Sequence, residues 1–275
     1  MTAPLNCATF SHVMKHLFLI VCLLLTASTG HAETERVKLR HVQRVVLDPG
    51  HGGENTGCMG FHGVYEKFVT LSIARRIAAR LEATTDAEVL LTREDDEFIG
   101  LRERTRFANE KQADIFLSIH MNASPHSSVQ GLETYFLSTE SASAEIQALV
   151  EREQAADAPA PTPDLEVERK KDLDRILLDM QLGAAHALSE TLAASIQRQM
   201  ARNVDAQDRG IKQAPFAVLK ESHCPAVVIE CGFLTHSREG TRLLSDAHQE
   251  KLAEGIVDGI IAYDSRIHRR TRERN

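Results

Sequence analysis

The chain has 275 residues, 43% of them hydrophobic, which suits one large α/β domain or two small ones. Its formal net charge of −7 lacks the positive excess with which general nucleic-acid binders attract phosphates, so no nucleic-acid partner is expected. The sequence contains no internal repeat.

The N-terminus has the residue order of a secretory signal peptide. A basic pair precedes an apolar run at residues 17–25, and small and polar residues follow up to Ala32. The apolar run is too short to span a bilayer comfortably, and no cysteine follows Ala32, so no stable membrane anchor is expected. We predict cleavage after Ala32 and export through the inner membrane to the periplasm. Translation could start at Met1 or at Met14.

Strands and helices alternate in the first half of the predicted mature chain. Short apolar runs predict strands, and amphipathic patterns of helical period predict helices. In chain order we expect a strand at 44–47, a glycine-rich loop, a helix that opens at Glu66, a strand at 88–92, a helix at 101–111, and strands at 115–119 and 131–137. This alternation predicts an α/β single domain at 33–264, with a mostly parallel, twisted sheet flanked by helices on both faces.

The pattern changes after residue 137. The segments are a small and polar stretch with helical tendency at 138–150, a linker-like Ala/Pro stretch at 155–163, a helical pattern at 165–200, apolar runs predicted as strands at 216–219 and 226–229, and a last helix at about 247–263. We interpret 138–182 as a helical regulatory insertion within the domain. The basic segment 265–275 is expected to be a solvated tail.

Side chains with ligand or acid–base chemistry stand where three apolar strands end. They are His51, His120 and Glu230, and the ends of parallel strands share one edge of a sheet. Glu66, at the start of a helix, can return to that edge. Two imidazoles and one carboxylate suit zinc with a water in the fourth position, and a second carboxylate is then needed as general base. The residues alone leave open which of Glu66 and Glu230 has which role.

Three cysteines follow the predicted cleavage site, at Cys58, Cys224 and Cys231. An odd number allows at most one disulfide, and the spacing does not say whether any pair forms. Strand alternation should point Cys231 away from the Glu230 face, so we expect its side chain to pack in the core.

Six stretches resemble the zinc-dependent N-acetylmuramoyl-L-alanine amidases of the type-3 family, which are bacterial cell-wall hydrolases. They are LDPGHGG (47–53), VYEK (64–67), LTREDDEFIGLRERTRFAN (91–109), ADIFLSIHMNA (113–123), GLETYFL (131–137) and PAVVIECGFLTH (225–236), in the family's order. The resemblance implies one zinc ion bound by His51, Glu66 and His120, with Glu230 as the catalytic carboxylate. It implies cleavage of the amide between N-acetylmuramic acid and L-alanine in peptidoglycan. Ser118 and Asn122 are weaker candidates for orienting substrate or metal ligands.

The insertion resembles a segment of the division-linked members of this family. There a helix lies over the zinc and blocks substrate until a catalytically inactive partner of LytM-type fold lifts it. The resemblance therefore implies a LytM-type activator and a role in cell-wall remodelling and daughter-cell separation. Such a helix needs a carboxylate for the metal, and the candidates are Glu151 and Glu153, with Glu153 favoured. A solvated, disordered loop is the alternative.

Two other functions stay open from the residues alone. A zinc peptidase or a different amidase would use the same ligands, and only the family resemblance selects the muramoyl amide. A secreted wall-binding or regulatory module with an inactive site should have lost a ligand or Glu230, and none is lost.

Overall fold

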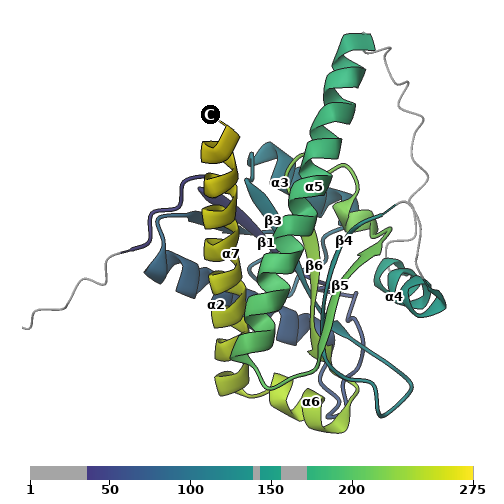
Figure 1. Ribbon diagram of the computed structural model, residues 1–275. Coiled ribbons are helices and arrows are strands. Elements are labelled where there is room, and N and C mark those ends of the chain that lie inside the picture. The colour runs from purple at the N-terminus through teal and green to yellow at the C-terminus, as the bar shows by residue number, and fades with distance from the viewer. Residues whose placement is uncertain (1–35, 139–142, 156–171, 275) are drawn as a thin grey trace, which may run out of the picture. The chain divides into compact units, whose positions relative to one another are not determined.

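The computed structural model describes residues 36–138, 143–155 and 172–274 (Figure 1). The predicted signal peptide lies outside these ranges. So do two parts of the predicted insertion, residues 139–142 and 156–171, together with the side chains of residues 172–182.

A six-stranded sheet forms the centre of residues 36–274, in the order β2-β1-β3-β6-β4-β5 (Figure 1). The strands are β1 (Arg44–Pro49), β2 (Glu88–Leu91), β3 (Ile115–Asn122), β4 (Leu132–Leu137), β5 (Asp208–Ala214) and β6 (Ala226–Phe233). Strands β2, β1, β3 and β6 are parallel, whereas β4 pairs antiparallel with β6 and parallel with β5. The predicted mostly parallel sheet is confirmed. The reversal of β4 brings its first residues to the edge where β3 and β6 end.

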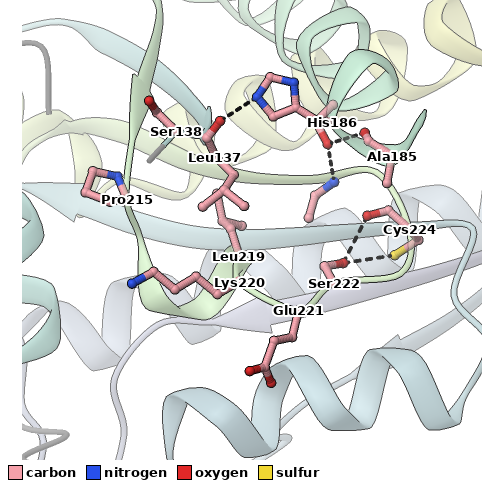
Figure 2. A pocket seen from close by; sticks show the side chains of 12 residues that line it. Leu137, Ser138, Ala185, His186, Pro215, Leu219, Lys220, Glu221, Ser222 and Cys224 are labelled. Carbon is pink, nitrogen blue, oxygen red and sulfur yellow. Dashed lines mark hydrogen bonds between the residues drawn. The ribbon is translucent and has the colours of Figure 1, made fainter. Parts of the chain in front are cut away.

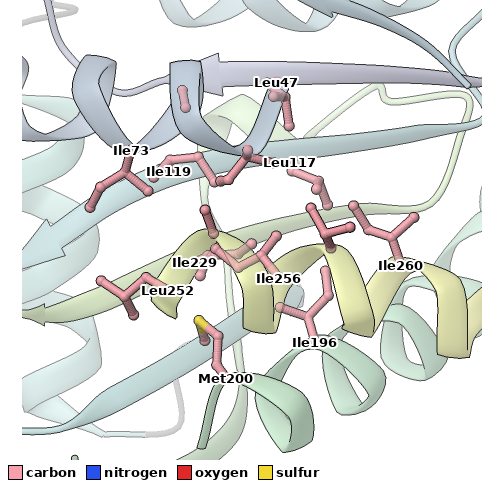
Figure 3. Close-up of a cluster of buried hydrophobic side chains, with 14 of the residues drawn as sticks. Leu47, Ile73, Leu117, Ile119, Ile196, Met200, Ile229, Leu252, Ile256 and Ile260 are labelled. Atoms are coloured by element: carbon pink, nitrogen blue, oxygen red, sulfur yellow. The ribbon is translucent and has the colours of Figure 1, made fainter. Parts of the chain in front are cut away.

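Helices cover both faces of the sheet, as predicted. One face packs against α2 (Glu66–Thr84), α5 (Asp172–Asn203) and α7 (Asp246–Arg274), and buried side chains such as Ile73, Ile196 and Ile256 meet Leu117 and Ile229 there (Figure 3). Fully burying such a side chain stabilises the fold by about 1.5–3 kcal/mol. Cys231 lies in this core, as expected, and all three described cysteines are free thiols.

The opposite face carries a smaller core and the shorter helices. These are α3 (Leu101–Glu110), α4 (Ala144–Gln154) and the 3-10 helix η1 (Ala217–Leu219), whereas α6 (Ser237–Leu243) follows β6. Helix α4 begins at the N-cap Ser143, whose side chain accepts a hydrogen bond from the backbone N–H of Ile146. Ile146, Leu149 and Val150 bury the apolar face of α4 against this core. The N-terminal part of the predicted insertion is thus a packed helix.

Two predicted elements differ from the structure. Residues 216–219 are not a strand, because Pro215 has no N–H with which to continue the ladder, and their apolar side chains fill the smaller core instead. The strand at this position is β5, whose mostly half-buried sequence DRGIKQA lacks an apolar run. The basic segment 265–274, expected to be a solvated tail, continues α7 as a helix, and its residues 269–273 are exposed. Within the described ranges, no helix combines the length and apolar character needed to cross a bilayer.

Candidate metal centre

The loop after β1 holds His51 in an unusual backbone conformation. Its φ of 61° lies in the left-handed region, which costs a non-glycine residue free energy unless the surroundings fix it. Two buried arginines do so by donating hydrogen bonds to loop carbonyls. Arg104 Nη2 lies 2.8 Å from the His51 oxygen, and Arg93 Nη2 lies 2.8 Å from the Gly50 oxygen.

Two glycines of this region leave room for the histidine rings. A Cβ at Gly50 would lie 2.4 Å from His120 Nε2, and a Cβ at Gly57 would lie 2.6 Å from His51 Cδ2. Gly57 also has φ +65°. Any side chain at either position would displace a ring, so the glycines are needed for close approach rather than for flexibility.

Four buried side chains bring one ligand atom each to a common point. They are His51, Glu66 and His120, placed by β1, α2 and β3, and Glu153 of α4, and the four atoms lie within 4.8 Å of one another. His51 Nε2 is 3.1 Å from Glu66 Oε1 and 2.9 Å from Glu153 Oε2. His120 Nδ1 is 3.2 Å and 2.9 Å from the same two oxygens. Ligand atoms on a tetrahedral zinc ion are separated by about 3.3 Å, so these separations fit such an ion.

The charges of this cluster also favour a bound cation. Burial alone would lower the pKa of His120, but the carboxylates of Glu153 and Glu66 raise it to about 9, and Glu66 and Glu153 raise the pKa of His51 well above its usual range. Arg152 supplies one positive charge to Glu153, and imidazole protons or a divalent cation can supply the rest of the charge that the two buried carboxylates favour. His51 Nε2 and Glu153 Oε2 are buried and lie 2.9 Å apart, but neither atom has a hydrogen-bond partner. The donor set fits a divalent metal ion.

Hydrogen bonds fix the orientation of the ligands that come from the sheet side. Glu66 Oε1 accepts from the Met121 N–H at 2.8 Å, and Glu66 Oε2 accepts from the Cys58 N–H at 3.0 Å. His51 Nδ1 lies 2.9 Å from Asn55 Oδ1, which makes Nδ1 the donor and leaves the Nε2 lone pair free for a metal. Sequence reasoning missed Asn55 as a partner, although it lies only four residues beyond His51.

Glu230 is fully buried beside this cluster and has no hydrogen-bond partner on either carboxylate oxygen. It is the register partner of His120 across β3 and β6. Burial and the negative charge of Glu153 raise the pKa of Glu230 well above its usual range. An unpaired buried carboxylate costs free energy, and such a group is suited to accept and return a proton.

Helix α4 packs on the smaller core and covers the cluster from that side of the sheet. Arg152 fixes it in place, donating to the Ala123 oxygen at 3.0 Å and to Glu153 Oε1 at 3.0 Å. Glu153 is buried, whereas the exposed Glu151 makes its contact with Gln147 of the same helix at 2.8 Å. Of the two acidic candidates, the structure brings only Glu153 to the cluster.

The two weaker candidates from the sequence lie in different networks. Ser118 donates to Asp48 Oδ2 at 2.7 Å, within the buried network around Arg104. Asn122 Nδ2 donates to Glu133 Oε2 at 3.1 Å, and Asn122 Oδ1 accepts from Arg152 Nη2 at 3.3 Å. Ser118 therefore supports the loop, and Asn122 links β3 to α4.

Glu133 is a buried neighbour of Glu230 that sequence reasoning missed. It is the register partner of Glu230 on β4 and is almost fully buried. It lies at this edge because β4 is antiparallel to β6, which the alternating pattern did not predict. The only signal was an acidic residue within the apolar run GLETYFL.

A separate cavity of about 390 Å³ lies at the other end of β4 and β6 (Figure 2). Its lining includes Leu137, His186, Ser222 and Cys224, and His186 Nε2 lies 2.8 Å from the Leu137 oxygen. The described metal-ligating group lies at the opposite edge, so this cavity is not part of the candidate site.

Comparisons with known proteins agree with the site. The profile of the type-3 N-acetylmuramoyl-L-alanine amidase family matches residues 45–262. The amidase AmiA of Salmonella typhimurium is 35% identical over 246 residues, covering 87% of this chain and 82% of AmiA, and Escherichia coli AmiA is 34% identical with the same coverage.

Solved structures show the same likeness. The crystal structure of an N-acetylmuramoyl-L-alanine amidase from Clostridium difficile 630 superposes with a TM-score of 0.61 at 31% identity, covering 82% of this chain and 97% of that one. The amidase CwlD from Clostridioides difficile, solved in complex with the GerS lipoprotein, superposes with a TM-score of 0.60 at 26% identity, covering 81% and 98%. The chain therefore belongs to the type-3 family of N-acetylmuramoyl-L-alanine amidases.

Proposed function

We propose that the protein is a zinc-dependent amidase that is weakly active while α4 is docked and becomes fully active when the helix is displaced. The observation that carries this proposal is the four-residue cluster, in which His51, Glu66 and His120 come from the body of the domain and Glu153 comes from α4. The substrate is the amide between N-acetylmuramic acid and L-alanine in peptidoglycan, as for the family.

The three residues of the domain body would hold one zinc ion per chain. When bound, zinc polarises a carbonyl and lowers the pKa of water at the fourth position. Glu153 would take that fourth position while α4 is docked, because its carboxylate lies with the other three side chains, and substrate and water would then be kept from it.

Glu230 is the proposed catalytic carboxylate. It would take the proton of the attacking water and pass it to the nitrogen of the leaving L-alanine. Its buried, unpaired oxygens and raised pKa suit both steps. Asn122 and Arg152 are proposed to hold α4 over this group rather than to touch substrate.

Removal of α4 requires a partner in this proposal. CwlD was solved in complex with a lipoprotein, and a protein of LytM-type fold is the partner that we propose for this chain. The amidase would act in the periplasm on wall remodelling and daughter-cell separation, after export directed by residues 1–32.

Product analysis of digested peptidoglycan tests the reaction. The zinc-loaded enzyme should create new L-alanine amino termini and leave the glycan strands intact. A metal chelator should abolish the products, and added zinc should restore them. New termini at another peptide bond, or undiminished products in excess chelator, would contradict the proposal.

A further inference from the structure

Arg209 of the edge strand β5 is held between Glu133 of β4 and helix α4. Its Nε donates to the buried Glu133, the register partner of Glu230, and its guanidinium lies 5.3 Å from the ring centre of Phe233 at the end of β6. The other side of the guanidinium meets α4, where Nη2 donates to Glu145 Oε1 at 2.8 Å. Sheet residues thus orient Arg209, and the insertion supplies its remaining partner.

The local charges balance only while α4 is docked. Arg209 and Lys212 both donate to Glu133 Oε1, so two cations share one buried carboxylate. Among the described residues, Glu145 is the further carboxylate paired with these cations, and its side chain is 64% exposed. Displacement of α4 would leave one surplus positive charge on a pre-oriented guanidinium. Such a group favours a carboxylate partner, which it can bind with charge-assisted hydrogen bonds.

A cavity of about 480 Å³ extends from the end of β3 to Arg209. Asn122, two residues after the ligand His120, lines it together with Tyr135, Phe233 and Arg209. Glu145 and Arg152 of α4 line it as well. Once α4 leaves, a ligand with its reacting amide at the four-residue cluster could therefore reach Arg209 along the sheet-side wall of this cavity.

We propose that Arg209 binds a free carboxylate of the peptide part of the substrate, and that Glu145 takes the place of this carboxylate while α4 is docked. Glu145 and Glu153 lie roughly two helical turns apart, about 12 Å along the axis. Helix α4 therefore presents one carboxylate to the metal cluster and a second one to Arg209. This inference rests on the proposed function, because the peptide part of the substrate lies near Arg209 only if its muramoyl amide is bound at the four-residue cluster.

The test compares two soluble muramoyl peptides, one with free peptide carboxylates and one with every peptide carboxylate amidated. The zinc-loaded full chain should cleave the acid with a kcat/KM about tenfold higher than the amide, as expected for loss of one charge-assisted hydrogen bond. Arg209→Gln should bring the acid-to-amide ratio of kcat/KM close to one, and Arg209→Lys should restore part of the preference. The ratio is the readout, because loss of the Arg209–Glu145 contact loosens α4 and changes both rates together. A wild-type ratio in Arg209→Gln would overturn the proposal, because a structural role through Glu133 predicts an equal change for both substrates.

Glu145→Gln tests the same contact without changing Arg209. Glu145 is the carboxylate that α4 presents to Arg209, so its loss should weaken the docking of α4 and raise cleavage of both substrates about threefold. The acid-to-amide ratio of kcat/KM should stay at the wild-type value, because Glu145 has left with α4 in the enzyme form that cleaves. Glu151→Gln, also exposed on α4, is the matched control and should act at the wild-type rate on both substrates. A folded, zinc-loaded Glu145→Gln enzyme no faster than wild type would contradict the claim that Glu145 takes the place of a substrate carboxylate.

The outcomes separate the two proposals. A folded, zinc-loaded Glu153→Ala enzyme that cleaves neither compound at the muramoyl–alanine amide would contradict the proposed function. Cleavage of both compounds at equal rates would leave the amidase intact and overturn only the assignment of Arg209.

Discussion

The candidate metal site of four side chains has two parts that are built in different ways. His51, Glu66 and His120 are placed by β1, α2 and β3, and buried backbone N–H groups and arginines fix their positions. Glu153 comes from the 11-residue helix α4, which three buried apolar side chains and the contacts of Arg152 hold to the domain.

In the function that we propose, this difference separates metal binding from its control. The side chains on the sheet side cannot move without breaking the sheet and the larger core, whereas departure of α4 would break no strand pairing and would expose only three of its side chains in the smaller core. A site built in this way can stay assembled around its metal while access to it changes. The predictions below test each side of the cluster separately.

The largest expected effect comes from removing a ligand on the sheet side. His120→Ala leaves two sheet-side ligands, too few for a stable zinc site, so zinc stoichiometry should fall from about one to near zero and activity should fall to background. Elemental analysis and a peptidoglycan digest measure the two quantities. A variant that retains one zinc ion per chain would show that His120 is not a ligand.

Glu230→Gln should separate metal binding from catalysis. The amide has a similar shape but cannot accept the proton of the attacking water, so activity should fall by about 10²–10⁴-fold while zinc content stays at one per chain. The circular dichroism spectrum should match that of wild type. Zinc lost together with activity would instead make Glu230 a ligand.

Asn55→Ala should weaken the metal site without removing a ligand. Loss of the Asn55 contact frees the His51 ring to rotate and to change tautomer, and such changes cost about 10–100-fold in metal affinity. Competition with a chromogenic zinc chelator measures this affinity. Glu54→Ala, at the exposed neighbouring position, is the control and should keep the wild-type value.

Ser118→Ala should reduce stability and leave catalysis nearly unchanged. Burial raises the pKa of Asp48, but Arg104 and hydrogen bonds from Thr92 and Ser118 outweigh it and hold the pKa below its usual range. Loss of the Ser118 contact should lower the free energy of unfolding by about 1–3 kcal/mol near neutral pH, with less than about a twofold change in kcat.

The stability difference between wild type and Ser118→Ala should depend on pH. Because Asp48 has a lower pKa in the folded state, its contribution is complete above the usual value of 3.8 and is lost as pH falls through the folded value. Urea unfolding at several pH values should show the difference shrinking below pH 3.8. A difference that grows on acidification would contradict the role assigned to Ser118.

Much of the sheet edge was predictable because apolar runs ended in polar residues. His51, His120 and Glu230 each follow such a run, and the structure brings them together where parallel strands end. Glu66 could also be predicted at this edge, because it is the first residue of α2. Glu133 was missed because its place depends on the reversed direction of β4, which strand and helix alternation does not encode.

Other parts of the site needed the packing of the whole domain. The polar sequence of β5 does not read as a strand, since an edge strand has few buried positions, and Arg209 was therefore not considered. Glu151 and Glu153 are both acidic and close in sequence. Only the docking of Ile146, Leu149 and Val150 decides which of them faces the metal cluster.

Paired substitution of Glu153 and Glu151 tests the central claim, that α4 blocks a site assembled by the sheet. Both variants would be loaded with one zinc ion per chain and assayed for new L-alanine amino termini on purified peptidoglycan. Glu153→Ala should act at least about tenfold faster than wild type, since each loss of about 1.4 kcal/mol in helix docking raises the open population tenfold. Glu151→Ala should act at the wild-type rate. A folded, zinc-loaded Glu153→Ala enzyme no faster than wild type would contradict the account.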